Sequence, residues 1–266
     1  KMKKYIVIGN PIEHSLSPKL HNYWFKLNNI TANYEKELLD DNELENFANK
    51  IKDKQIHGAN VTVPFKEKII SYVDTLSEEA KAANSVNTLY LSEKKIIGHN
   101  TDIVGFYHSL KNNFIKFKFD KALILGSGGA SPSIIVALKR LGVKKIFVSN
   151  RTKDKAVNLK KKFKFIEVIN WGETVKADII INTTSLGLNM SDKIDLNYDL
   201  FGSESFFYDL IYKPENTNFL ENAKKRGNSV QNGLMMFVYQ AAESFKIWHG
   251  INPKIDEKLI DFLKYD

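Results

Sequence analysis

A glycine cluster near the middle of the chain has the residue types and spacing that bind phosphate. The sequence GSGGAS at residues 126–131 follows an apolar run at 122–125 and precedes a helix-like run at 133–141. Glycines have no Cβ, so they adopt tight turns and let backbone N–H groups approach an anion. A helix that begins here adds free N–H groups and a partial positive charge. The order of strand, glycine turn and helix therefore predicts a dinucleotide-binding unit.

Basic and hydroxyl side chains follow the next predicted strand, residues 145–149. They are Arg151 and Thr152, with Lys153 and Lys155 close by. In NAD-binding units an acidic residue about 20 residues past the glycines binds the ribose 2′-hydroxyl. No Asp or Glu occupies that position here, and cations with a hydroxyl suit a 2′-phosphate instead. The pattern therefore predicts NADP(H) as the cofactor.

Polar residues also follow two strands that we expect in the first part of the chain. Ser15 and Ser17 lie after the first strand, and Asn60, Thr62 and Lys66 lie after a later one. Ligands of open α/β sheets bind at the carboxyl ends of the strands, so these groups could converge on a ligand. Ser17 is also a typical helix N-cap, whereas Ser15 has no such explanation. Hydroxyl and backbone donors in this loop suit a carboxylate.

Lys66 and Asp102 each have an ordinary structural explanation when they are considered alone. A lysine after a strand is usually solvated, and Asp102 could cap a helix predicted over residues 103–110. Local sequence therefore favours capping for Asp102 and gives only modest support to a chemical role for Lys66.

The elements that position these residues alternate between strands and helices, which is typical of α/β proteins. A strand that begins near residue 55 ends in a polar turn, and Pro64 opens a further helix. We expect the other strands over residues 4–9, 31–36, 84–90, 95–98, 122–125, 145–149, 165–169, 177–182 and 205–210, and the other helices over 18–27, 41–51, 77–83, 103–110, 133–141, 152–163, 218–226, 233–246 and 256–263.

Polar and glycine-containing motifs recur along the whole chain. They are Gly9-x-Pro11-x-x-x-Ser15-x-Ser17-Pro18-x-x-His21-Asn22, Gly58-x-Asn60-Val61-Thr62-x-Pro64-Phe65-Lys66, Asn84-x-x-Asn87-Thr88, Gly98-x-Asn100-Thr101-Asp102, Gly126-x-Gly128-Gly129-Ala130, Asn150-Arg151-Thr152, Asp209-x-x-Tyr212 and Gln240-Ala241-Ala242. In order and spacing these motifs resemble those of the shikimate dehydrogenase family. The resemblance covers essentially the whole chain, and the lysine and aspartate motifs are more specific than the glycine loop.

The resemblance implies a fold and a reaction. The fold is α/β with two domains, an N-terminal substrate domain over residues 1–102 and 236–266 and a Rossmann-like NADP-binding domain over 103–235. The C-terminal helices would thus return to the first domain. The implied reaction is the reversible NADPH-dependent reduction of 3-dehydroshikimate to shikimate in chorismate and aromatic amino acid biosynthesis. The enzyme would be cytoplasmic, a monomer or homodimer, with a small-molecule substrate.

The resemblance also implies a role for individual residues. Lys66 and Asp102 would form the catalytic pair at the C3 hydroxyl, and Ser15 and Ser17 would hold the carboxylate. The remaining substrate contacts would come from Thr62, Asn87, Asp102, Tyr212 and Gln240. NADP(H) would be bound by Gly126, Ser127, Gly128, Gly129, Ala130, Asn150, Arg151, Thr152, Lys155, Leu210 and Gly233.

Lys155 departs from the family pattern, because many members have a second arginine of the 2′-phosphate clamp there. Lysine keeps the charge but loses the bidentate fork, which softens the preference for NADP. A quinate/shikimate dehydrogenase with broader substrate or cofactor use is therefore the nearest alternative. A non-catalytic NADP-sensing regulator is a second one, although it would not need Lys66, Asp102 and both serines together.

Composition argues against several other classes of protein. The 266 residues include no cysteine and carry a net charge of +8. The lysines are spread along the chain rather than interleaved with aromatic residues, so we expect no nucleic-acid partner. No apolar run reaches 18 residues, and no histidine cluster has metal-ligand spacing, so we expect neither a membrane partner nor a metal site.

Overall fold

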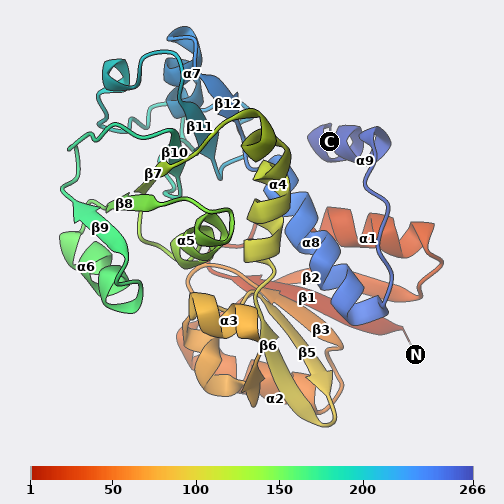
Figure 1. Cartoon of the computed structure of the whole chain (residues 1–266). Coiled ribbons are helices and arrows are strands. Elements are labelled where there is room, and N and C mark those ends of the chain that lie inside the picture. Colours follow the sequence, from red (N-terminus) through yellow and green to blue (C-terminus); the bar gives the residue numbers. More distant parts are fainter. Residues whose placement is uncertain (1, 266) are drawn as a thin grey trace. The chain divides into compact units, whose positions relative to one another are not determined.

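The computed structural model describes residues 2–265, with the backbone alone for residues 114 and 115. The chain divides into two compact units, each with its own six-stranded sheet (Figure 1). The first unit contains the residues up to Gly105 together with those from Val238 onward, and the second is Phe106–Phe237. The C-terminal segment thus belongs to the first unit.

The sheet of the first unit is mixed, with the strand order β2-β1-β3-β5-β6-β4. Strand β1 pairs in parallel with both β2 and β3, and β5 and β6 form an antiparallel hairpin next to β3. Its strands are β1 (Lys3–Gly9), β2 (Ala32–Leu38), β3 (Gly58–Val61), β4 (Thr75–Leu76), β5 (Thr88–Ser92) and β6 (Lys95–His99).

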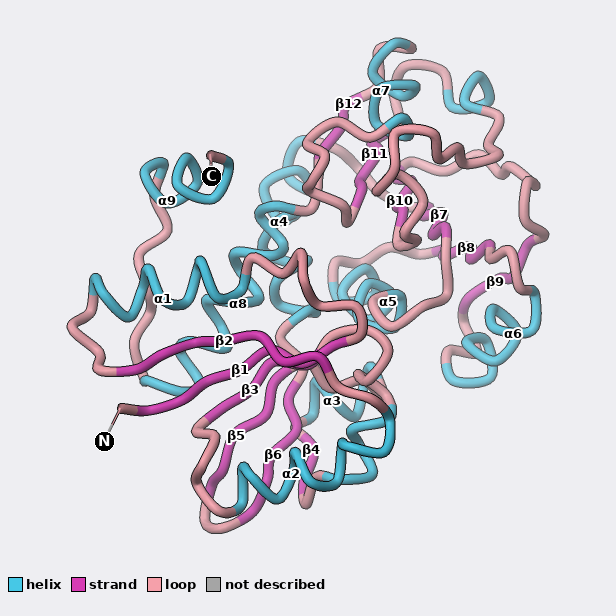
Figure 2. Tube along the Cα trace, turned by 180° about the vertical axis from the view of Figure 1, so that it is seen from behind, coloured by secondary structure: helices cyan, strands magenta, loops and turns pink. Residues whose placement is uncertain are grey.

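Alternating side chains of β1 pack on opposite faces of this sheet, as the period of two in a strand requires. Ile6 and Ile8 lie in the core that contains Phe47 of α2 (Leu44–Lys52). On the other face, Tyr5 packs against Phe25 of α1 (Ser17–Leu27) and Trp248 of α8 (Leu234–His249), with its ring centroid 5.1 Å from that of Trp248. Figure 2 shows α1 and α8 on one side of the sheet and α2 on the other.

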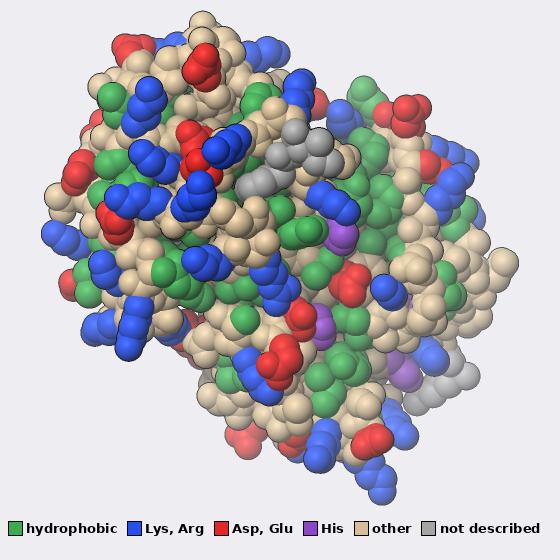
Figure 3. All heavy atoms as spheres, in the orientation of Figure 1, with side chains coloured by type: hydrophobic (Ala, Val, Ile, Leu, Met, Phe, Trp, Pro, Cys, Tyr) green, Lys and Arg blue, Asp and Glu red, His purple; other side chains and the backbone are tan. Residues whose placement is uncertain are grey.

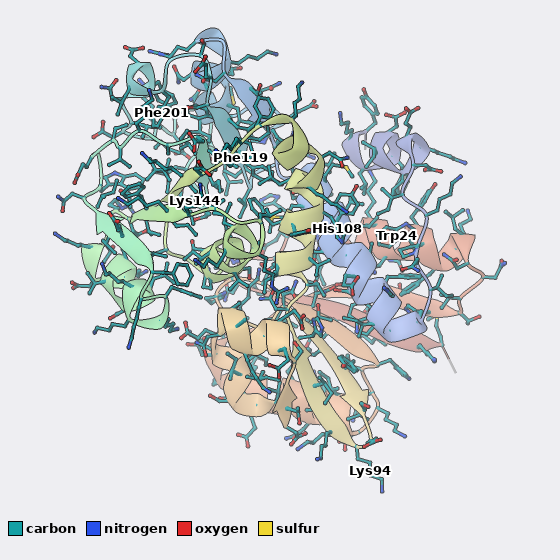
Figure 4. All side chains as sticks on the ribbon, viewed as in Figure 1. Trp24, Lys94, His108, Phe119, Lys144 and Phe201 are labelled. Atoms are coloured by element: carbon teal, nitrogen blue, oxygen red, sulfur yellow. The ribbon has the colours of Figure 1, made fainter. Side chains whose placement is uncertain are left out.

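Helices α1 and α2 of the first unit are amphipathic and bury their apolar stripe against the sheet. Trp24 of α1, labelled in Figure 4, is fully buried. Helices α4 (Asp102–Lys116) and α8 (Leu234–His249) each begin in one unit and end in the other. The others are α1 (Ser17–Leu27), α2 (Leu44–Lys52), α3 (Glu78–Ala83) and α9 (Glu257–Lys264), with 3₁₀ turns at Asp41–Glu43 and Lys68–Tyr72.

The sheet of the second unit is entirely parallel, with the order β12-β11-β10-β7-β8-β9. Numbered from β7, this is the 3-2-1-4-5-6 order of the doubly wound dinucleotide-binding fold. The chain order therefore reverses between β7 and β10, at the point where such folds bind ligands. The strands are β7 (Lys121–Leu125), β8 (Lys145–Ser149), β9 (Ile166–Ile169), β10 (Ile179–Asn182), β11 (Phe206–Asp209) and β12 (Ser229–Gln231).

The central strands of the second unit are buried on both faces, which explains their continuous apolar sequence. All four residues of β10 and of β11 are buried. On one face, Phe201, labelled in Figure 4, packs edge-on against Phe207 at 5.4 Å. The helices are α5 (Ser131–Arg140), α6 (Lys153–Lys162) and α7 (Asn218–Lys225), with a 3₁₀ turn at Tyr198–Phe201.

The predicted fold class is confirmed, whereas some local predictions are wrong. Pro64 does not open a helix, because the Phe65 N–H bonds to the Thr62 carbonyl at 2.9 Å and closes a turn. The next helical segment begins at Lys68 and is a 3₁₀ turn. Strands β4 and β12 were not predicted, since two or three residues carry no periodicity. Among residues 2–265, no helix combines the length and hydropathy needed to cross a bilayer.

Candidate active site

The Lys66 and Asp102 side chains form a short, shielded ion pair in the first unit. Lys66 Nζ lies 2.6 Å from Asp102 Oδ2, and the side chains are 12% and 7% exposed. Asp102 Oδ1 accepts a hydrogen bond of 3.1 Å from Asn87 Nδ2. An ammonium group has three N–H donors, so the donors that do not face Asp102 can reach an oxygen atom of a ligand. The pair can therefore hold such an oxygen and exchange a proton with it.

The backbone around Lys66 is fixed on both sides of the residue. Phe65 is 1% exposed and anchors the turn that follows β3. The Lys66 carbonyl accepts a hydrogen bond of 2.8 Å from the Val86 N–H, just before β5. With its backbone fixed, Lys66 directs its side chain at Asp102. Most lysine side chains are solvated, but this one is largely buried.

Asp102 is the first residue of α4, but it is not the helix cap. Asn100 Oδ1 accepts a hydrogen bond of 3.2 Å from the Ile103 N–H, which is the bond that an N-cap makes. The capping explanation of Asp102 is therefore wrong. Because Asn100 takes that role, the Asp102 carboxylate is available to Lys66.

The amide of Asn87 is oriented by a backbone group that can only donate. The Thr101 N–H lies 2.7 Å from Asn87 Oδ1, so Asn87 Nδ2 must face the opposite way. On that side Nδ2 lies 3.1 Å from Asp102 Oδ1 and 3.3 Å from Gln240 Oε1. The structure thus brings together Asn87, Asp102 and Gln240, which are separated widely in sequence.

Ser15, Ser17 and Thr62 lie at one edge of the first sheet, because β1 and β3 are parallel neighbours whose carboxyl ends meet there. The N-cap prediction for Ser17 is wrong, since Ser17 is the first residue of α1 and its side chain bonds to the hydroxyl of Tyr34. Ser15 takes a capping-like role instead, as its Oγ accepts the Ser17 N–H at 3.3 Å. Ser15 keeps its own hydroxyl proton for another acceptor.

A buried polar cluster under Asn87 and Asp102 was only partly visible in the sequence. Ser244 Oγ lies 2.8 Å from Thr88 Oγ1 and 3.2 Å from Thr101 Oγ1, and it accepts a bond of 3.1 Å from Asn60 Nδ2. Asn60, Thr88 and Thr101 occur in the motifs above, but nothing in the sequence distinguishes Ser244 from other helical serines. These four residues connect α8 to β3, to β5 and to the segment before α4.

In the second unit, the glycine loop lies at the carboxyl end of β7, at the switch point of the sheet. Gly126 has a φ of +112°, and a Cβ there would lie 2.5 Å from Thr183 Oγ1. At Gly128, by contrast, an added Cβ would meet nothing within 4 Å. Asn150 Oδ1 accepts the Ser127 N–H at 3.1 Å and fixes the loop. Gly129 and Ala130 lead directly into α5, so the helix N-terminus faces this open space.

Arg151, Thr152 and Lys155 follow β8, the strand next to β7. All three are exposed. Within the range that the structure describes, the Arg151 and Lys155 side chains make no hydrogen bond or ion pair. These cations can therefore bind an anion without first giving up a partner.

Leu210 and Gly233 lie against each other in the second unit. A Cβ on Gly233 would lie 1.9 Å from the Leu210 carbonyl oxygen, so only glycine fits. Tyr212 belongs to this unit too, where its ring stacks on Phe237 at 5.1 Å, and burial raises its pKa to about 12. The sequence assigned no role to Asp209, which is fully buried beside Leu210.

No group of three or more His, Asp or Glu side chains within residues 2–265 could hold a metal ion. The polar side chains gathered around Asp102 in the first unit are those of Lys66, Asn87 and Gln240. They suit hydrogen-bonded organic ligands.

Family models match three segments of the chain. The model described as shikimate dehydrogenase substrate binding domain matches residues 7–89, and that described as shikimate / quinate 5-dehydrogenase matches residues 109–209. The shikimate 5′-dehydrogenase C-terminal domain model matches residues 233–257.

Individual proteins are similar over the full length. The shikimate dehydrogenase (NADP(+)) of Pelagibacter ubique is 55% identical over 261 residues, which is 98% of either chain. The crystal structure of shikimate dehydrogenase from Aquifex aeolicus has a TM-score of 0.91 and 38% identity, and the match covers 100% of this chain and 98% of that one. The Thermus thermophilus shikimate 5-dehydrogenase in complex with NADP(H) and shikimate has a TM-score of 0.89 and 32% identity, with 99% of each chain covered.

Proposed function

The chain belongs to the NADP-dependent shikimate dehydrogenase family, and from this membership we propose how its residues carry out the reaction. The activity is the reversible, NADP-dependent oxidation of shikimate. We propose that the oxidised carbon is C3 and that the product is 3-dehydroshikimate. The observation that carries this proposal is the shielded pair of Lys66 and Asp102, 2.6 Å apart.

The residues of the second unit fit NADP(H). The open space at Gly128, the start of α5 and the loop fixed by Asn150 suit the pyrophosphate. Arg151, with Thr152 and Lys155, would hold the 2′-phosphate, and Leu210 and Gly233 would lie near the nicotinamide. When bound, NADP+ supplies the hydride acceptor of the reaction.

Most of the substrate contacts would come from the first unit. Ser15 and Ser17 would bind the carboxylate by hydroxyl and backbone donors. Thr62, Asn87 and Gln240, and Tyr212 of the second unit, would bind the remaining substrate groups. These contacts would fix the orientation of C3, which lowers the entropic part of the barrier.

The Lys66–Asp102 pair would donate a proton to the C3 oxygen in one direction and accept it in the other. In the direction of reduction, a Lys66 N–H donates to this oxygen and stabilises the negative charge that develops on it. Asp102 holds the ammonium in place, and Asn87 holds Asp102. In the direction of oxidation the same pair removes the hydroxyl proton, because a reversible reaction uses the same groups both ways.

The proposal extends to the organisation of the enzyme. The first unit would be the substrate-binding and catalytic domain, and the second the NADP-binding domain. Family membership supports a cytoplasmic location and a monomer or homodimer. A nucleic-acid partner has little support, since Figure 3 shows Lys and Arg side chains interspersed with Asp and Glu on the face it draws.

The experiment is NADPH formation followed by absorbance, with purified protein, shikimate and NADP+. Parallel reactions contain NAD+, or quinate in place of shikimate. Rapid NADPH formation with shikimate and little with the other pairs is the expected result. Comparable turnover of quinate or NAD+ would identify the broader quinate/shikimate dehydrogenase. No turnover together with intact NADPH binding would favour the NADP-sensing regulator.

A further inference from the structure

The carboxylate of Asp209, at the end of β11, is fully buried and faces hydrogen-bond donors only. Thr217 Oγ1 donates to Oδ2 at 2.6 Å, and Asn182 Nδ2 and the Ile211 N–H each donate to Oδ1 at 3.0 Å. Among the described residues, Asp209 has no ion-pair partner. A buried carboxylate without a cation is costly, so its presence calls for a reason.

The bonds of Asp209 fix the loops that follow β10 and β11. Asn182 Oδ1 accepts bonds from the Thr184 N–H and hydroxyl at 3.0 and 2.7 Å, and Asn182 Nδ2 donates to the Leu186 carbonyl at 3.0 Å. Thr217 is also the N-cap of α7. One carboxylate therefore orients both loops at the carboxyl edge of the sheet.

The loop after β10 contacts the glycine loop directly. Thr183 Oγ1 donates to the Leu125 carbonyl at 2.9 Å and lies 2.8 Å from Ser131 Oγ, at the start of α5. A Cβ on Gly126 would lie 2.5 Å from Thr183 Oγ1 and 2.9 Å from Thr184 Cγ2. The shape of the glycine loop thus depends on the loop that Asp209 and Asn182 hold.

We propose that Asp209 is a positioning residue for the cofactor, because its ionised carboxylate holds the loops after β10 and β11 and the first of these supports the glycine loop, and that cofactor binding weakens when this carboxylate is protonated. The proposal rests on the NADP site proposed above. A protonated carboxyl carries no charge and has an O–H. On Oδ1 this O–H would compete with the bonds from Asn182 and Ile211, and on Oδ2 the Thr217 hydroxyl would have to turn and accept from it. In either case the neutral group holds the two loops more weakly than the carboxylate does.

The titration range of Asp209 lies near neutral pH. Burial raises the pKa of Asp209 to about 6, although the bonds from Thr217, Ile211 and Asn182 oppose the shift. The titratable groups that face it are Tyr198 and Tyr208, and burial raises the pKa of both well above 10. Both tyrosines stay neutral in this range, so Asp209 changes its charge alone.

The experiment is the KM for NADP+ at saturating shikimate, from pH 5 to pH 8, for the wild type and Asp209→Asn. At pH 5 about one-eleventh of Asp209 is ionised, so the wild-type KM should rise about tenfold. The asparagine of the variant would mimic the protonated form at every pH. We therefore expect the ratio of variant to wild-type KM to be highest at pH 8 and to fall about tenfold by pH 5, because only the wild-type KM rises.

Asp178→Asn is the matched control. Asp178 Oδ2 accepts the N–H groups of Asp120 and Lys121 at 2.8 and 2.7 Å, at the amino end of β10 in the same sheet. Its KM ratio to the wild type should not vary with pH. The 2′-phosphate of NADP+ also titrates, but it does so equally in all three proteins and cancels in the ratios.

A pH-independent ratio for Asp209→Asn would overturn the positioning role, provided that the wild type reduces NADP+ with shikimate at pH 8. A wild type without this activity would instead refute the proposed function. If Asp209→Asn does not fold, the same KM profiles are measured for Thr217→Val and Thr217→Ser, and their comparison tests the proposal. The loss of the hydroxyl in Thr217→Val should move the acid limb of the KM profile to higher pH, whereas Thr217→Ser should leave it in place. Identical limbs in the two variants would overturn the proposal.

Discussion

Replacement of Lys66 by methionine should remove the proton-transfer group and leave Asp102 buried without its cation. Methionine keeps the apolar stem but has no ammonium. Asp102 would retain only the Asn87 hydrogen bond. Breaking a buried pair costs about 3–5 kcal/mol, and because these side chains are 12% and 7% exposed, we expect about 3 kcal/mol of lost stability.

The double variant Lys66→Met/Asp102→Asn separates stability from chemistry. Asparagine has almost the shape of aspartate, accepts the same bond from Asn87 and carries no charge. The double variant should therefore regain most of the lost stability. Its kcat should stay as low as that of Lys66→Met, about 10²–10⁴-fold below the wild type, which is the range that acid–base groups contribute.

The assays are urea unfolding and initial rates of NADPH formation with shikimate. The KM for shikimate should change less than kcat, because Ser15 and Ser17 are untouched. A kcat for Lys66→Met within about tenfold of the wild type would refute the proton-transfer role. If the double variant is no more stable than Lys66→Met, the unpaired charge of Asp102 is not the cause of the lost stability.

Three further predictions concern the glycine loop, the clamp and the buried histidine. Gly128→Ala should leave the melting temperature unchanged but raise the KM for NADP+, whereas Gly126→Ala should lower the melting temperature, since its Cβ would meet Thr183; equal effects on stability would contradict this. Arg151→Ala should raise the KM for NADP+ about tenfold or more and spare NAD+, and equal loss of both would argue against a 2′-phosphate contact. Burial lowers the pKa of His21 from 6.5 to about 3, so the unfolded chain binds the extra proton. The wild type should therefore lose stability as the pH falls from about 6.5 towards 3, by up to about 5 kcal/mol from this group. His21→Phe should reduce that loss in urea unfolding at about pH 4 and pH 7, and an unchanged loss would contradict the assignment.

The second unit was largely predictable from sequence because its signals are local. Continuous apolar runs indicated the buried parallel strands, and the glycines after the run at 122–125 indicated the turn that opens α5. The choice of NADP followed from Arg151 and the absence of an acidic residue at the same place. Only strand β12, with three residues, was too short to leave a pattern.

The first unit was less predictable because its interactions are long-range. Local sequence favoured capping for Asp102, and this prediction was wrong because Asn100 takes the cap. The capping prediction for Ser17 was wrong because the Ser17 side chain bonds to the hydroxyl of Tyr34, which lies on β2. Ser244 carries no local signal, because its partners lie on β3, β5 and the segment before α4.

The crystal structure of the protein with bound shikimate would test the central claim most directly. The C3 oxygen should lie about 3 Å from Lys66 Nζ and within hydrogen-bond distance of Asp102, with the carboxylate at Ser15 and Ser17. A shikimate molecule bound in the opposite orientation, with its carboxylate at Lys66 and its C3 hydroxyl at the serines, would contradict the proposed mechanism.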